Sequence, residues 1–283
     1  MSLSAKAVVA LMGAIKQTGL VPGIGDLDIE LARAKEYNKK HTYIEPGDHK
    51  AVYETVQIGR CPVLIIRPHR KATEPEQNKV IMFLHGGGDR DTWKPEVSFA
   101  RNYGKQTGLD VFYPIYPPFT EVSVTETADM IYQVYRELAG KYSPGNLIVL
   151  GESYGGFLTL QLMTWINRNH HEVDMPGLVI MNSPFALPKS KEEWDLACRY
   201  EKKDFMVPEG AFDFMLGGIL KKDPQTPDYA LYPDQMDFHH APETYVFYAE
   251  ESCACVADSI QRSYERDGAG ERMHMHKEAG MMH

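Results

Sequence analysis

The sequence contains few cysteines, and they do not form a pattern typical of metal binding. The four cysteines are Cys61, Cys198, Cys253 and Cys255. Cys253 and Cys255 form a close pair, but no second pair and no nearby histidine cluster has the spacing of a zinc site. We therefore expect no metal site, and we expect ordinary thiols in a reducing compartment.

The sequence also lacks an excess of basic residues. It contains 30 Lys and Arg residues and 39 Asp and Glu residues, which gives a formal net charge of -9. A chain with this charge repels phosphate backbones. The composition therefore argues against a nucleic-acid partner.

No apolar segment is long enough to cross a membrane. The run from Ala7 to Ile15 is much shorter than the roughly 20 residues that a membrane-spanning helix needs. Only Lys6 precedes this run, and no small-residue cleavage site follows it, so the run does not fit a signal peptide either. We expect a soluble, cytoplasmic protein without a membrane partner, and a homodimer is compatible with the sequence.

From about residue 51 the sequence alternates between strand-like and helical patterns. Continuous apolar runs such as Val80–Leu84 are typical of central parallel strands, which are covered on both faces. Strands that alternate with helices predict an α/β sheet with right-handed crossovers. The strand-like runs are residues 53–57, 62–67, 80–85, 111–115, 147–150, 178–181, 244–249 and 272–276.

Two regions fall outside this alternation. Apolar residues between Val8 and Ile15 have helical spacing, and a second helical pattern runs from Asp26 to Lys40. Residues 184–240 are rich in proline, charged residues and aromatic residues. We expect this second region to form short helices over one end of the sheet.

The strongest chemical signal is the segment Gly151-Glu-Ser-Tyr-Gly-Gly156, which lies between an apolar strand and a helical run. A strand, a sharp turn and a helix form the context of a nucleophile elbow, in which the serine hydroxyl stands exposed. Glycines two residues on either side of the serine relieve crowding where the backbone is strained. We therefore predict that Ser153 is a nucleophile.

A second signal is His85-Gly-Gly-Gly88, which directly follows an apolar strand. A tetrahedral intermediate carries an oxyanion, and backbone N–H groups must approach it to hydrogen-bonding distance. Side chains would block that approach, whereas successive glycines allow it. The glycine loop therefore fits an oxyanion hole for the serine downstream.

With these two motifs, the chain resembles the hormone-sensitive-lipase-like esterases among the α/β hydrolases. The shared segments are His85-Gly-Gly-Gly88, Val111-Phe-Tyr-Pro114, Gly151-Glu-Ser-Tyr-Gly-Gly156 and Gly280-Met-Met-His283. The resemblance implies an α/β-hydrolase fold: a mostly parallel eight-stranded sheet, helices on both faces and a helical cap. It divides the chain into a cap segment, 1–50, and a hydrolase domain, 51–283, with a cap or lid insertion at about 184–240.

The resemblance also implies roles for particular residues. It makes the N–H groups of Gly87, Gly88 and Tyr154 the oxyanion donors, and it makes His283 the general base. The order of the triad along the chain in this fold, serine, acid and then histidine, independently places the base late in the sequence. His274 and His276 alternate within a strand-like run and are expected to be held in the sheet, whereas His283 follows a glycine in a loop.

The acid of the triad is expected just after the strand 244–249. The position at which the related esterases carry Asp or Glu holds Ser252, and Glu250 and Glu251 come directly before it. Asp258 is a further candidate, although the helical pattern around Ile260 argues against it. Of these residues we predict Glu251 to be the acid of the triad.

These residues predict a serine carboxylesterase that hydrolyses a small-molecule ester through an acyl-enzyme and needs no cofactor or metal. Asp89, Arg90 and Asp91 follow the glycines, and Tyr154 stands where related esterases carry alanine; both features favour small or short-acyl esters. Two alternatives remain open. The displaced acid favours a non-catalytic ligand-binding protein, and an amide or peptide hydrolase is possible because the fold does not determine the substrate.

Overall fold

The computed structural model describes residues 12, 14–16, 18, 22–41, 45–69, 78–90, 94–169, 172–250 and 257–279. Eight strands form one sheet in the order β1-β2-β4-β3-β5-β6-β7-β8. Strand β2 runs antiparallel to β1 and β4, and all other neighbouring pairs are parallel. The strands are β1 Val52–Ile58, β2 Cys61–Arg67, β3 Val80–Leu84, β4 Asp110–Pro114, β5 Leu147–Glu152, β6 Leu178–Asn182, β7 Thr244–Ala249 and β8 Met273–Glu278.

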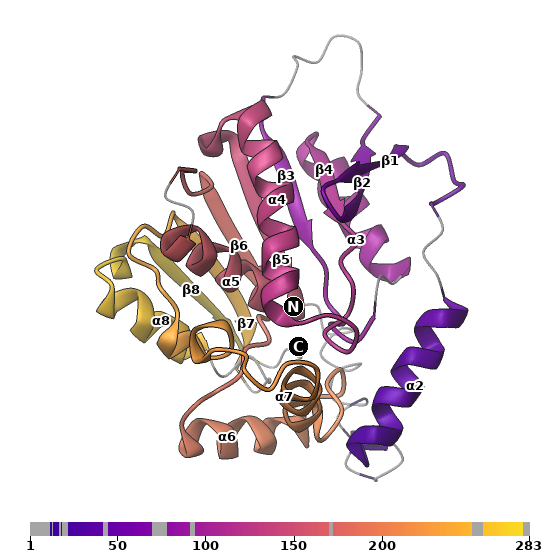
Figure 1. Ribbon diagram of the computed structural model, residues 1–283, viewed down its shortest axis with the longest axis vertical. Coiled ribbons are helices and arrows are strands. Elements are labelled where there is room, and N and C mark those ends of the chain that lie inside the picture. The colour runs from indigo at the N-terminus through magenta and orange to yellow at the C-terminus, as the bar shows by residue number, and fades with distance from the viewer. Residues whose placement is uncertain are drawn as a thin grey trace.

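The predicted α/β-hydrolase sheet is confirmed, because each of the eight strand-like runs corresponds to one strand with ends that differ by at most a few residues. The longer helices lie on both sides of this sheet and beyond the carboxyl ends of its parallel strands (Figure 1). They are α2 Leu27–Lys40, α3 Lys94–Thr107, α4 Val124–Tyr142, α5 Tyr154–Asn169, α6 Lys191–Glu201, α7 Ala211–Lys222 and α8 Ala257–Arg266. Short 3-10 turns occur at Pro144–Asn146, Asp228–Ala230, Pro233–Gln235 and Gly270–Arg272.

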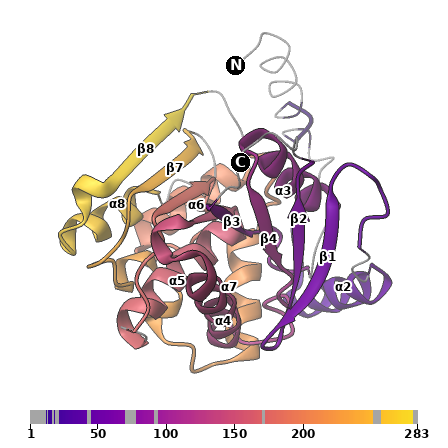
Figure 2. The same cartoon turned by 90° about the horizontal axis from the view of Figure 1, so that it is seen from above.

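The two faces of the sheet bury separate apolar clusters. Helix α3 covers one face, where its residues Val97 and Ala100 belong to the same buried apolar cluster as Ile81 and Phe83 of β3. Helices α4, α5 and α8 cover the other face, as the view along the sheet shows (Figure 2). All five residues of β3 are buried, which explains why its sequence is a continuous apolar run.

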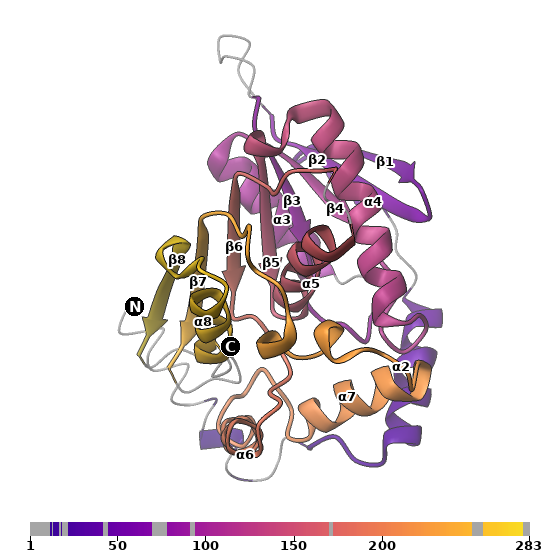
Figure 3. The ribbon, with the colours of Figure 1, turned by 60° about the vertical axis from the view of Figure 1, so that its left-hand side comes forward.

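Helices α2, α6 and α7 lie beyond the carboxyl ends of the parallel strands (Figure 3). Helix α2 begins at its N-cap residue Asp26, whose carboxylate accepts the N–H groups of Asp28 and Ile29. An ion pair between Asp28 and Lys221 joins α2 to α7, and Leu27 packs over Gly217. In the predicted helix 8–15, Met12, Ala14 and Ile15 are helical, and its other residues lie outside the described part of the chain.

No helix in the described ranges combines the length and the apolar character that crossing a membrane requires.

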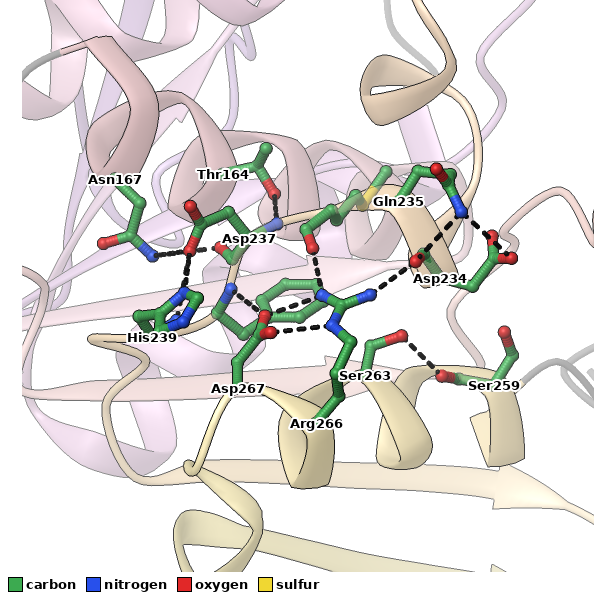
Figure 4. Close-up of polar contacts among 12 residues, drawn as sticks. Thr164, Asn167, Asp234, Gln235, Asp237, His239, Ser259, Ser263, Arg266 and Asp267 are labelled. Atoms are coloured by element: carbon green, nitrogen blue, oxygen red, sulfur yellow. Dashed lines mark hydrogen bonds and ion pairs between the residues drawn. The ribbon is translucent and has the colours of Figure 1, made fainter.

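The segment that leads into β7 is held by one arginine (Figure 4). The guanidinium of Arg266, at the end of α8, binds both carboxylate oxygens of Asp267 at 2.7 Å and also donates to the backbone carbonyls of Asp234 and Met236. Asp267 in turn accepts the N–H of Phe238 at 2.8 Å. These bonds attach the end of α8 to the chain before β7.

We expect Asp267→Asn to lower the free energy of unfolding by about 2 kcal/mol at neutral pH, because it weakens a charged pair and disturbs a backbone bond. Burial by itself would raise the pKa of Asp267, but Arg266 and the Phe238 N–H hold that pKa below its ordinary value. The contribution of Asp267 to stability is therefore present above about pH 4 and is lost as the pH falls through the folded-state pKa.

Urea unfolding of both proteins at several pH values measures this difference, which should shrink in acid. The control is Asp195→Asn, which removes an exposed partner of Lys191 and should change stability by less than about 0.5 kcal/mol. Equal effects of the two substitutions would contradict a structural role for the arginine-centred bonds.

Candidate active site

The sharp turn between β5 and α5 places Ser153 in a strained conformation. Its φ is 51°, in the left-handed region that residues with a side chain seldom adopt. The N–H of Ser153 donates to the carbonyl of Asn182 at 3.0 Å, and its carbonyl accepts the N–H groups of Gly156 and Phe185, both at 2.9 Å. Bonds from two sides therefore hold the turn in this conformation.

Glycine is required in this turn because α5 lies very close to the sheet. A β-carbon at Gly155 would overlap the carbonyl of Leu84, and one at Gly151 would overlap the carbonyl of Gly155. Real β-carbons do not approach backbone atoms so closely. The glycines that suggested an elbow in the sequence are thus explained by close contact between helix and strand.

The glycine loop after β3 lies directly against the elbow. A β-carbon at Gly86 would stand 3.3 Å from the β-carbon of Ser153. Gly87 has a φ of 67°, which glycine adopts without strain. The carbonyl of Gly87 accepts the N–H of Arg90, and the carbonyl of Gly88 accepts the N–H of Phe119, both at 2.9 Å.

Aromatic stacking fixes the start of this loop. The ring of His85 stacks on Tyr116 at 4.1 Å and on Tyr113 at 5.1 Å between centroids. The hydroxyl of Tyr116 donates to the carbonyl of His85 at 2.6 Å. His85 therefore supports the loop through packing, and its contacts fix the point at which the glycine segment begins.

The side chain of Tyr154 is buried beside the glycine loop. It is 3% exposed and packs against Phe119 and Phe157, and its ring fills the space beside Gly88. The bulky ring, which the sequence analysis took to favour short-acyl esters, is thus packed inside the protein. The N–H of Tyr154, which belongs to the first residue of α5, remains the predicted oxyanion donor.

The charged residues after the glycines contact α2. The amide of Asn38 donates to the carbonyl of Asp89 at 2.9 Å, and the guanidinium of Arg90 lies 4.6 Å from the ring centre of Tyr37. Arg90 also approaches the carboxylate of Asp89 at 3.6 Å. Helix α2 thus covers the outer side of the glycine loop. Asp91 lies outside the described residues.

The predicted base and acid cannot be compared with the structure, because Glu251, Ser252 and His283 lie outside the described residues. They stay predictions. Glu250 directly follows β7 and approaches Lys277 at 3.7 Å. Asp258 lies in the first turn of α8, where the Tyr248 hydroxyl approaches it at 3.5 Å.

The histidines that the sequence analysis set aside lie in β8. His274 is hydrogen-bonded to Glu243 at 2.7 Å and stacks on Tyr245. His276 stacks on Phe247. Both rings are engaged on one face of the sheet edge, as their alternation in the sequence predicted.

One group of side chains in the described ranges has the spacing of a cation site. The donor atoms of Asp237, His239 and Asp267 lie within 4.8 Å of one another. However, Arg266 binds both oxygens of Asp267, and His239 lies 2.9 Å from Asp237, which also accepts from Asn167 (Figure 4). Arg266 thus neutralises Asp267, and the group joins α5, α8 and the chain before β7.

Sequence reasoning missed a half-buried polar group beside the elbow. Glu152 immediately precedes Ser153, and one of its oxygens accepts the hydroxyl of Tyr103 at 2.7 Å and the amide of Asn182 at 2.8 Å. The only signal in the sequence is a charged residue at the end of an apolar strand. Burial raises the pKa of Glu152, and the two donors oppose that shift.

A family model described as the alpha/beta hydrolase fold matches residues 81–283, and the chain therefore belongs to this family. A search of curated protein sequences finds no match. The structure is similar to that of an esterase from the bacterial hormone-sensitive lipase family, with a TM-score of 0.73 and 16% identity over 100% of this chain and 91% of that chain.

Two further solved structures show the same fold. EstE7, a homologue of hormone-sensitive lipase from a metagenome library, has a TM-score of 0.72 and 18% identity over 100% of this chain and 90% of that chain. EstE5, in a crystal soaked with p-nitrophenyl butyrate, has a TM-score of 0.73 and 17% identity over 97% and 89%. The predicted resemblance is confirmed.

We expect Gly155→Ala to lower the free energy of unfolding by more than about 3 kcal/mol, because its β-carbon would overlap the backbone of β3. Gly140→Ala in α4 is the matched control, since nothing lies within 4 Å of its new β-carbon. Alanine should stabilise that helix by roughly 0.5 kcal/mol. Thermal unfolding of both variants measures the contrast, and an unchanged midpoint for Gly155→Ala would refute the close contact.

Proposed function

We propose that this protein is a serine carboxylesterase that hydrolyses short-acyl esters. The observation that carries the proposal is the contact between the strained turn at Ser153 and the glycine loop at Gly86. Acyl transfer needs a hydroxyl nucleophile beside backbone N–H groups that face the developing oxyanion. The two motifs supply both parts, although they are separated by more than sixty residues in the chain.

In the proposed reaction, the hydroxyl oxygen of Ser153 attacks the ester carbonyl while His283 takes its proton. The N–H groups of Gly87, Gly88 and Tyr154 bind the negative oxygen of the tetrahedral intermediate. The intermediate collapses when the C–O bond to the alcohol breaks and His283 returns the proton to the leaving oxygen. Water then attacks the acyl-enzyme, with His283 as the base, and releases the acid.

The preference for short acyl chains is supported by the surroundings of the glycine loop. Helix α2 lies over the loop through Asn38 and Tyr37, and charged Asp89 and Arg90 border it. Desolvating these groups beside a long alkyl chain costs free energy, whereas a short chain leaves them hydrated. The soak of EstE5 with p-nitrophenyl butyrate makes that short ester a suitable first substrate.

We expect the protein to hydrolyse p-nitrophenyl butyrate, and Ser153→Ala to reduce kcat by at least about a thousandfold because the nucleophile is lost. Release of p-nitrophenol measures the rate, and labelling with a fluorophosphonate reports whether Ser153 is activated. Thermal unfolding of Ser153→Ala serves as the control for folding. An active Ser153→Ala protein, or a wild type that neither hydrolyses nor labels, would refute the proposal and favour the ligand-binding alternative.

We expect Glu251→Gln to reduce kcat by about a hundredfold or more, because an amide can present the wrong partner to the His283 imidazole. Ser252→Ala is the neighbouring control and should change kcat by less than about threefold. Reversed sensitivities would instead make the Ser252 hydroxyl the group that orients the histidine. If neither substitution matters, Asp258→Asn becomes the decisive variant.

A further inference from the structure

A buried carboxyl group from α3 lies beneath the glycine loop. Glu96, in the first turn of α3, is 8% exposed, and its carboxyl accepts the backbone N–H of Gly86. A β-carbon at Gly86 would stand 3.2 Å from a carboxyl oxygen of Glu96 and 3.3 Å from the β-carbon of Ser153. Gly86 is therefore held between the carboxyl of Glu96 and the nucleophile.

A second carboxyl group, that of Glu152, lies close enough to influence Glu96. Its charge disfavours ionisation of Glu96, and it is the residue directly before Ser153. The two carboxyl groups thus flank the junction of loop and elbow, Glu96 at Gly86 and Glu152 at Ser153. Two negative charges so close together in a buried place are unfavourable, and one proton shared by the pair relieves the repulsion.

Hydrogen bonding decides which of the two carboxyl groups holds the proton. One oxygen of Glu152 accepts two donors, from Tyr103 and Asn182. Glu96 accepts the Gly86 N–H, and none of the described residues donates to its second oxygen, which is buried. Burial and then the charge of Glu152 raise the pKa of Glu96 to about 7, against the opposing effect of the Gly86 N–H. Glu96 is therefore the proton holder.

The other titratable groups around Glu96 do not neutralise it. Tyr103 on α3 and Tyr116 after β4 face it, and burial raises the pKa of both, so they stay uncharged near neutral pH. His85 lies one residue before Gly86, and its ring stacks between tyrosines. In the described part of the chain, no Lys or Arg is among the groups that shift the pKa of Glu96.

We propose that Glu96 is a positioning residue of the esterase site, which holds the glycine loop through Gly86 and, by losing its proton, limits hydrolysis on the alkaline side. This inference rests on the proposed function, because it concerns the same oxyanion. The protonated carboxyl fixes the loop without adding charge. The ionised carboxyl places a negative charge beside the loop where the oxyanion develops, and thereby opposes the transition state.

The test is the pH dependence of kcat/KM for p-nitrophenyl butyrate, followed at the isosbestic wavelength of p-nitrophenol. The wild type should show a bell-shaped profile: the acid limb reports His283, and the alkaline limb, a decrease of about tenfold between pH 7 and pH 9, reports Glu96. Glu96→Gln keeps an acceptor for the Gly86 N–H but cannot ionise. Its profile should rise to a plateau and stay there to about pH 9.

Two further variants sharpen the test. Glu152→Gln removes the neighbouring charge, so the alkaline limb should move to lower pH while its amplitude stays the same, because the charge of Glu152 raises the pKa of Glu96. Glu137→Gln on α4 removes an exposed carboxyl paired with Lys141 and should leave the profile as in the wild type. A residue that merely stabilised the fold would alter the amount of active protein and would not move a limb of the profile.

A readout that does not depend on hydrolysis separates this inference from the proposed function. In carbon NMR of protein labelled at the glutamate carboxyl groups, the resonance that disappears in Glu96→Gln should titrate near pH 7. If that resonance titrates in the usual pH range of a glutamate carboxyl group, the inference is overturned even if the enzyme is active. An alkaline limb that persists in Glu96→Gln also overturns it. A wild type without hydrolysis and without labelled Ser153 refutes the proposed function, and the positioning role is then withdrawn with it.

Discussion

Helix α5 meets strands β3 and β5 at such short range that only glycine fits at the points of contact, and the geometry of the site depends on this proximity. Gly155 lies against the carbonyl of Leu84, and the turn before it forces Ser153 to a φ of 51°. The same proximity brings the loop after β3 against Ser153, since β3 and β5 are adjacent parallel strands. Strain at one residue is tolerated because bonds from Asn182 and Phe185 hold the turn.

This close packing explains why the carboxyl groups of Glu96 and Glu152 differ in their hydrogen-bond partners. Polar side chains that pack around the tight turn need hydrogen-bond partners within the protein. Glu152 does so through Tyr103 and Asn182, whereas Glu96 has only the Gly86 N–H among the described residues. The two neighbouring carboxyl groups thus differ in the number of hydrogen bonds that they accept, and this difference results from how the backbone is held around Ser153.

Much of the fold could be predicted from the sequence, because buried parallel strands such as β3 appear as continuous apolar runs. The elbow and the glycine loop could also be predicted, because their glycine motifs follow from the backbone geometry of short segments. Glu96 could not be predicted, since a glutamate in the first turn of a helix is expected for its favourable interaction with the helix dipole alone. The position of the Tyr154 side chain could not be predicted either, because its ring lies against Phe119, a residue of a distant loop. Such contacts depend on how separate elements meet in space. The triad acid and base, Glu251 and His283, stay predictions because they lie outside the described residues.

The attachment of α2 to α7 has a consequence for the order of events during synthesis. Helix α2 is made early, yet its partners, Lys221 and Gly217, belong to a helix near the end of the chain. At about 5–20 residues per second, a ribosome needs roughly ten seconds or more to produce α7 after α2 has emerged. During that interval Leu27 and its apolar neighbours have no surface to cover. A nascent chain that stalls before α7 would therefore leave the side of α2 around Leu27 without its partner, although the contacts of α2 with Asp89 and Arg90 need only the first ninety residues.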